Sequence, residues 1–181
     1  MAEAAADRAA AARDRAEAER LRDEAAAMLT LAATDELTGA WSRRFGLDEL
    51  EKTRVRAHRE ETRLVLVFVD VDKLKHINDQ HGHQAGDELL GLIGYVVRAH
   101  LRPYDVAVRY GGDEFVCGIP NTSEADARAR FGEIATVLKL LDREHSISFG
   151  VAEAGLGESL NRLIMRADAD LLQARESRRF A

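Results

Sequence analysis

The chain has 181 residues, of which 46% are hydrophobic and 32% charged, a composition that supports a packed core and excludes global disorder. Its 32 acidic residues outnumber the 26 lysines and arginines and leave a net charge of −6, which argues against binding a nucleic acid polymer. The one cysteine, Cys117, excludes an internal disulfide, and the longest apolar run, Leu64 to Val69, is too short for membrane insertion.

Residues 1–34 differ in composition from the rest of the chain. They are rich in alanine, contain no glycine or proline, and mix acids with arginines, which predicts one long helix. Small and apolar residues recur at heptad spacing at Ala18, Leu21, Ala25, Met28 and Ala32. Two interpretations stay open: a solvated helix, and a parallel coiled-coil stub that dimerises the chain or transmits a signal. No signal peptide is recognisable, so we expect a cytoplasmic protein.

From residue 35 to residue 181 we expect one globular domain. Helices are predicted over residues 42–61 and 84–101, from Ser123 with its capping partner Asp126, and after Ser159. Strands are predicted over residues 64–69, 106–110, 115–119 and 146–152, with Gly111-Gly112 as the turn of a hairpin. Strands interleaved with covering helices predict an α/β fold with a mixed central sheet flanked by helices.

Three acids stand where a metal site could form. Asp70 follows the apolar strand, and Asp113 and Glu114 follow the hairpin glycines. If the hairpin pairs beside the 64–69 strand, these carboxylates meet at one edge of the sheet, where their repulsion favours a bound cation such as Mg²⁺. Gly111 and Gly112 would let a ligand approach the backbone. The alternative is that Asp113 and Glu114 are only polar turn residues.

A long polar stretch, residues 72–87, lies between this strand and the next helix, the usual location of a binding loop. Asn78 and Asp87 could bind a base edge, and a carboxylate suits the N1–H and N2 amino groups of guanine rather than adenine. Lys75 could neutralise phosphate charge. Three histidines in the stretch suggest zinc as an alternative, but neither cysteines nor the H-x-x-x-H spacing supports it.

Together these residues resemble the GGDEF domain of diguanylate cyclases. The resemblance runs from about Asp35 to the C-terminus, in the order and at the spacings of the family. It is carried by Asp35-Glu-Leu-Thr-Gly39, Asp70-Val-Asp72, Lys75-x-x-Asn78-Asp79-x-x-Gly82-His83-x-x-Gly86-Asp87, Arg109-Tyr-Gly-Gly-Asp-Glu-Phe115 and Ser148-Phe-Gly150.

The resemblance implies a palm-like fold related to nucleotidyl cyclases and polymerases. It also implies a homodimer in which each protomer binds one GTP, and in which the two nucleotides are joined into cyclic di-GMP with release of two pyrophosphates. The cofactor would be Mg²⁺, or Mn²⁺ in its place.

The resemblance also assigns roles to individual residues. Asp70, the main-chain carbonyl of Val71 and Asp113 would hold the metal, and Asp113 or Glu114 would help deprotonate the 3′-hydroxyl. Asn78 and Asp87 would bind guanine beside His83. Lys75 would stabilise charge on the reacting phosphates, which the main chain near Lys73 and Leu74 would contact.

Arg102 and Asp105 form an R-x-x-D sequence that ends shortly before the hairpin glycines. In the family this position is the inhibitory product site, where arginines bind the phosphates and guanine edges of cyclic di-GMP. The alternative is an arginine at a helix end beside a proline-containing turn.

Two segments depart from the family pattern. Ala40-Trp41-Ser42-Arg43 replaces the usual leucine and Asn-Arg pair, and the C-terminus lacks the usual glycine. Arg175 and Arg179 could still bind phosphate, or they could be cations of a solvated helix end.

We therefore expect an active diguanylate cyclase with product inhibition. One rival is a catalytically silent GGDEF module that binds GTP or cyclic di-GMP as a signalling receptor. Another is a structural dimerisation protein, which would leave the acids unexplained.

Overall fold

The computed structural model describes residues 15–24 and 33–179, with side chains up to residue 177. The chain divides into two units, Met1–Thr34 and Asp35–Ala181. In the first unit, residues 15–24 form a helix with exposed side chains, and Ala18 and Leu21 lie on it. The other residues of the expected heptad seam, Ala25, Met28 and Ala32, lie outside the described residues, so the coiled coil stays a prediction.

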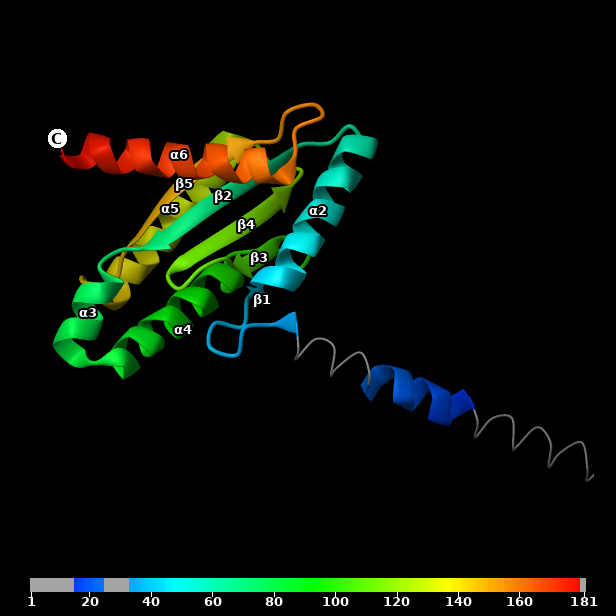
Figure 1. The fold of residues 1–181 in the computed structure, drawn as a ribbon, viewed down its shortest axis with the longest axis horizontal. Helices are drawn as coiled ribbons and strands as arrows, with labels where there is room; N and C mark the ends of the chain where they lie inside the picture. The colour runs from blue at the N-terminus through cyan, green and yellow to red at the C-terminus, as the bar shows by residue number, and fades with distance from the viewer. Residues whose placement is uncertain (1–14, 25–32, 180–181) are drawn as a thin grey trace, which may run out of the picture. The chain divides into compact units, whose positions relative to one another are not determined.

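The second unit is a five-stranded sheet with helices on both faces (Figure 1). Its elements are β1 (Trp41–Ser42), α2 (Arg43–Arg59), β2 (Leu64–Val71), α3 (Leu74–His81), α4 (His83–Ala99), β3 (Val106–Arg109), β4 (Glu114–Pro120), α5 (Glu124–Leu141), β5 (Ile147–Glu153) and α6 (Leu160–Arg179). The strand order is β1-β3-β4-β2-β5, with β1 parallel to β3 and the other pairs antiparallel. The mixed α/β sheet is therefore confirmed.

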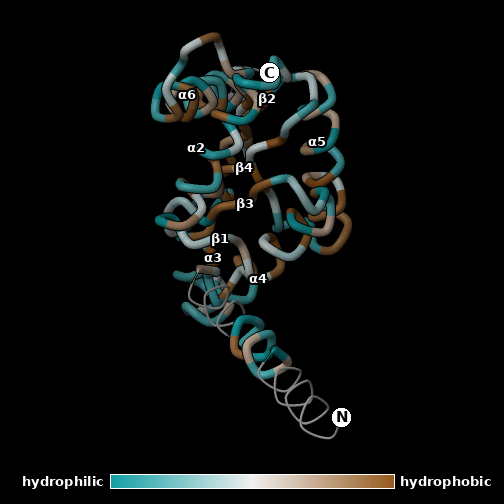
Figure 2. The backbone as a smooth tube through the Cα atoms, turned by 90° about the vertical axis from the view of Figure 1, so that its right-hand side faces the viewer, coloured by the Kyte–Doolittle hydropathy of each residue, from teal (hydrophilic) through white to brown (hydrophobic). Residues whose placement is uncertain are grey.

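Strand β2 is buried on both faces, as its continuous apolar run predicts. Val65, Val67 and Val69 alternate with Leu66 and Phe68, so the valines join the core under α4 and α5 while the other two join the core under α2 and α6. Figure 2 shows the sheet edge-on, with α2 and α6 on one side and α5 on the other. Two packed layers hold the centre of β2 rigidly, and its end at Asp70 is positioned by them.

The structure differs from the sequence prediction between residues 72 and 87. Most of this stretch is helical, because α3 occupies residues expected as a loop and only Gly82 separates it from α4. Ile77 is buried and Leu74 packs against the core, so one narrow apolar face supports α3 among many charged residues. Strand β1, which was also not predicted, has only two residues and leaves no periodic pattern to detect.

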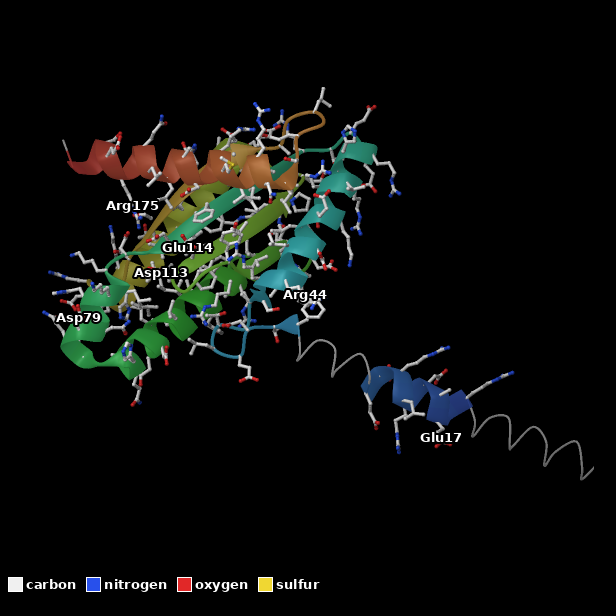
Figure 3. The ribbon with its side chains drawn as sticks, viewed as in Figure 1. Glu17, Arg44, Asp79, Asp113, Glu114 and Arg175 are labelled. Atoms are coloured by element: carbon white, nitrogen blue, oxygen red, sulfur yellow. The ribbon has the colours of Figure 1, made fainter. Side chains whose placement is uncertain are left out.

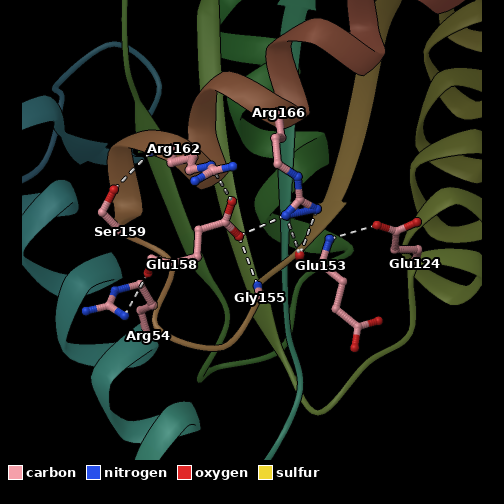
Figure 4. Close-up of polar contacts among 8 residues, drawn as sticks. All are labelled: Arg54, Glu124, Glu153, Gly155, Glu158, Ser159, Arg162 and Arg166. Carbon is pink, nitrogen blue, oxygen red and sulfur yellow. Dashed lines mark hydrogen bonds and ion pairs between the residues drawn. The ribbon is translucent and has the colours of Figure 1, made fainter.

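The start of α6 is fixed at the end of the sheet opposite Asp70, where β5 ends at Glu153 (Figure 4). The Glu158 carboxylate accepts hydrogen bonds from the Gly155 amide at 2.9 Å and from Arg166 at 2.8 Å. Arg166 also donates to the Glu153 carbonyl, and Arg54 of α2 donates to the Glu158 carbonyl. None of the helices in the described ranges is both long and apolar enough to cross a membrane.

Candidate active site

The three predicted acids do meet at one end of the sheet. Strands β2 and β4 pair in antiparallel register with Asp70 opposite Glu114, and the Val71 amide donates to the Asp113 carbonyl at 2.9 Å. Figure 3 shows Asp113 and Glu114 at this end of the hairpin, facing the helix that carries Arg175. The pairing of the hairpin with the buried strand therefore brings the acids to one edge of the sheet, as the sequence predicted.

Burial and mutual repulsion raise the pKa values of two of these acids. Desolvation is the largest cause for Asp70, whose pKa is also raised by the charges of Asp113 and Asp72 and lowered by Arg175. Desolvation likewise raises the pKa of Glu114, and the charges of Asp113 and Asp70 add to it. Because burial and mutual repulsion disfavour the negative charges of these carboxylates, the site favours a bound cation.

The donors present fit a magnesium ion that is only partly coordinated by protein. Within the part of the chain that the structure describes, no three acidic, histidine or cysteine side chains surround a common metal position. Asp70, Asp113 and the Val71 carbonyl are hard oxygen donors, and Mg²⁺ commonly takes one or two carboxylates and completes its shell with water and substrate phosphates.

The hairpin tip is held by a turn at the start of the domain, a role that the sequence alone did not indicate. The Asp35 carboxylate accepts hydrogen bonds from the Thr38 amide and hydroxyl, at 2.9 and 2.7 Å. It also pairs with Arg109, at 3.0 and 3.1 Å, and Arg109 donates to the Gly112 carbonyl at 3.0 Å. This chain of contacts connects the Asp35 turn to the backbone beside Asp113.

We expect Arg109→Ala to reduce the free energy of unfolding by about 2 kcal/mol, because it leaves the half-buried Asp35 carboxylate without its cation. Burial raises the pKa of Asp35, but the hydrogen bonds from Thr38 and the contacts with Arg109 outweigh it and lower that pKa. The stabilisation is therefore present at neutral pH and is lost as the pH falls below about 4. Chemical denaturation should show that the variant and the wild type differ less in free energy of unfolding at pH 3 than at pH 7. An equal difference at both pH values would contradict the stabilising role of the Asp35–Arg109 pair.

The predicted nucleotide residues lie on α3 and α4. Lys75, His83 and Asp87 are exposed, and Lys73, just before α3, has a left-handed backbone with φ 60° and ψ 20°. This conformation costs a residue other than glycine on the order of 1 kcal/mol, and such strain is concentrated at binding sites.

Asn78 is packed unusually closely. Its Oδ1 is buried and accepts no hydrogen bond from the described residues. The amide lies against Gly86 of α4, and a Cβ added at Gly86 would overlap Oδ1. Gly86 thus leaves the space that the Asn78 amide occupies.

Arg102 and Asp105 are brought together at the start of β3. The Arg102 amide donates to Asp105 Oδ2 at 2.8 Å, and Arg130 of α5 donates to the same oxygen at 3.1 Å. The Asp105 side chain has no exposed surface and burial raises its pKa, whereas Arg102 is exposed beside Tyr104. Both residues line a hollow of about 320 Å³. Arg130, which the sequence did not indicate, is therefore the direct partner of Asp105.

The structure places Arg175 on acids rather than in open solvent. Its guanidinium donates to the carboxylates of Asp70 and Asp72. Asp72 also accepts hydrogen bonds from Ser146 at 3.0 Å and Ser148 at 2.7 Å. The side chain of Arg179 lies outside the described residues, so its role on phosphate stays a prediction.

Comparisons with known proteins agree with this geometry. The family model described as "Diguanylate cyclase, GGDEF domain" matches residues 32–180. Response regulator PleD of Caulobacter vibrioides is 37% identical over 163 residues, and the match covers 84% of this chain and 36% of PleD. Diguanylate cyclase DgcS of Shewanella oneidensis is 34% identical over 152 residues, covering 82% of this chain and 51% of DgcS.

Among solved structures, the coiled coil and GGDEF domain of DgcB from Caulobacter crescentus, in complex with c-di-GMP, has a TM-score of 0.81 and 31% identity. That match covers 93% of this chain and 94% of the DgcB chain. This chain spans about a third of PleD and half of DgcS. A family model that matches nearly all of the globular unit confirms the resemblance seen in the sequence, and the chain belongs to the GGDEF domain family of diguanylate cyclases.

Proposed function

We propose that this domain is an active diguanylate cyclase that condenses two GTP molecules into cyclic di-GMP. In each of two steps, a 3′-oxygen attacks an α-phosphorus, a P–O bond forms, and pyrophosphate leaves. The observation that supports catalysis best is the meeting of Asp70, Asp113 and Glu114 at the hairpin, because a module that only binds nucleotide has no need of crowded carboxylates.

The acids at the hairpin would bind the metal ion and accept the proton of the 3′-hydroxyl. Asp70, Asp113 and the Val71 carbonyl would be the protein ligands of Mg²⁺ or Mn²⁺. When bound, the ion supplies charge neutralisation at the phosphates and a lower pKa for the attacking hydroxyl. Asp113 or Glu114 would accept the 3′-hydroxyl proton, since both residues lie at the hairpin next to Asp70.

The α3–α4 segment would bind the nucleotide. Asn78 and Asp87 would recognise guanine, with His83 beside them, and the backbone at Lys73 and Leu74 would contact the phosphates. The exposed Lys75 would neutralise charge that develops on those phosphates. Gly111 and Gly112 would leave room for the ligand, and a Cβ at Gly112 would meet nothing within 4 Å.

The reaction needs two copies of the domain. One protomer would hold one GTP, so two protomers must face each other before a 3′-hydroxyl can reach the second α-phosphate. Holding both nucleotides in this way makes the attack effectively intramolecular. The helix predicted over residues 1–34 would set how often the protomers meet.

Turnover of GTP tests the proposal directly. The purified chain is stripped of bound product, incubated at high concentration with GTP and Mg²⁺, and assayed for pyrophosphate and cyclic di-GMP. Two molecules of pyrophosphate are expected for each molecule of cyclic di-GMP formed. Nucleotide binding without turnover, under these conditions, would instead support the silent module.

We further propose that cyclic di-GMP inhibits the enzyme at Arg102 and Asp105. Their hollow lies at the start of β3, and the same strand ends at Arg109, which holds the hairpin. Arg102→Ala removes the exposed guanidinium and should raise the product concentration needed for half-inhibition by about tenfold or more. Arg143→Ala, an exposed arginine between α5 and β5, is the matched control. Unchanged inhibition in Arg102→Ala would refute the assignment.

A further inference from the structure

Arg175 is in direct contact with Asp70, one of the predicted metal ligands. It extends from α6 toward the ends of β2 and β4, where Figure 3 shows it facing Asp113 and Glu114. Its Nη2 donates to Asp70 Oδ1 and, at 3.1 Å, to Asp72 Oδ1. The guanidinium therefore neutralises an acid that a metal would also bind.

The position of Arg175 is set by close packing of α6 on β5. A Cβ added at Gly150 of β5 would overlap the backbone of Ala167 and Leu171 in α6, so glycine is what allows this approach. Residue 175 lies one helical turn beyond Leu171, on the same side of α6. The Ser148-Phe-Gly150 sequence thus supports Arg175 twice, through the close approach at Gly150 and through the Ser148 hydrogen bond to Asp72.

The two carboxylates differ in how they are held. Asp72 accepts hydrogen bonds from Ser146 and Ser148 as well as from Arg175. Among the described residues, the side chain of Asp70 accepts a hydrogen bond from Arg175 alone. If Arg175 leaves Asp70, Asp72 keeps its two serine donors and can still hold the guanidinium nearby.

The acids around Asp70 repel its negative charge, and the Arg175 guanidinium compensates for this repulsion. Asp113 and Asp72 both repel the charge on Asp70, and Arg175 opposes them. The paired groups are only 33% and 22% exposed, so solvent and salt screen their attraction weakly. A divalent cation that binds Asp70 would therefore compete with the Arg175 guanidinium for this carboxylate.

We propose that Arg175 is an internal counterion, which occupies Asp70 while the metal site is empty and is displaced when a divalent cation binds. The proposal rests on the proposed function for the identity of the cation site. Because Asp72 retains Arg175 within reach, the released guanidinium stays next to the phosphates that arrive with the cation. Metal loading and phosphate binding are in this way coupled through one side chain.

Mn²⁺ binding without nucleotide tests the proposal, with free Mn²⁺ measured by electron paramagnetic resonance. Arg175→Gln removes the competing cation, and we expect it to bind Mn²⁺ about tenfold more tightly than wild type. Arg175→Lys keeps the charge and should stay near the wild-type affinity. Asp70→Asn combined with Arg175→Gln should abolish the gain, which locates it at Asp70.

Arg166→Gln is the matched control, because it removes the same charge from the same helix at the far end of the sheet (Figure 4). Equal Mn²⁺ affinity in wild type and Arg175→Gln would overturn the proposal, and so would an equal gain in Arg166→Gln. The assay involves no GTP, so its failure is distinguishable from failure of the proposed function: wild-type chain that makes cyclic di-GMP would remain a cyclase without a counterion at Arg175.

Discussion

Asp113→Asn is expected to reduce cyclic di-GMP formation at least about a thousandfold, because it removes a proposed charged ligand of the metal and a candidate acceptor of the 3′-hydroxyl proton. Asp113 lies at the hairpin tip, where its backbone carbonyl accepts a hydrogen bond from the Val71 amide, and its charge acts on Asp70 and Glu114. Initial rates of pyrophosphate release with saturating GTP and Mg²⁺ measure the effect.

The same substitution should leave the fold intact. The charge of Asp113 raises the pKa values of Asp70 and Glu114, so its removal relieves repulsion in the metal-free domain. The midpoint of thermal unfolding should therefore stay constant or rise. Asp48→Asn, at an exposed position of α2, makes the same charge change and should retain full activity. Substantial turnover by Asp113→Asn would remove the basis of the proposed mechanism.

The elements that the sequence predicted well are those whose signal is local. The apolar run of β2 is continuous, the hairpin has its glycine pair, and Ser123 accepts a hydrogen bond from the Asp126 amide as the cap of α5. Helix α3 was missed because it has two turns and one narrow apolar face, and the polar residues around that face resemble a loop. Length and periodicity, more than composition, decided which elements could be recognised.

The acids of the site were predictable for a related reason. Asp70 and Asp113 each follow a recognisable strand, and one assumed pairing of strands brings them together. Their ion pairs were not predictable. Arg175 was predicted as a phosphate-binding residue, but its contact with Asp70 spans 105 positions of sequence, and at the other site Arg130 reaches Asp105 from another helix. Such contacts depend on how α5 and α6 pack on the sheet, and no spacing within the chain encodes them locally.

Gly86→Ala is expected to raise the KM for GTP about tenfold or more with a smaller change in kcat. The added Cβ would overlap Asn78 Oδ1 and force the amide out of its place between α3 and α4. A misplaced amide would lose the hydrogen bond to guanine that we propose for Asn78, a loss worth roughly 1–3 kcal/mol when the partner is left unpaired. Steady-state kinetics with GTP and with inosine triphosphate, which lacks the N2 amino group, should also show a reduced preference for GTP.

A double-mutant cycle separates this positioning role from simple damage to the helix. If Gly86 acts through Asn78, then Gly86→Ala should have little further effect on KM in an Asn78→Ala background, where the overlapping amide is absent. Gly132→Ala is the matched control, because a Cβ at that position of α5 would meet nothing within 4 Å. It should stabilise the helix by about 0.5–1 kcal/mol and leave KM unchanged. Equal effects of Gly86→Ala with and without Asn78 would show that the glycine serves α4 itself rather than the nucleotide.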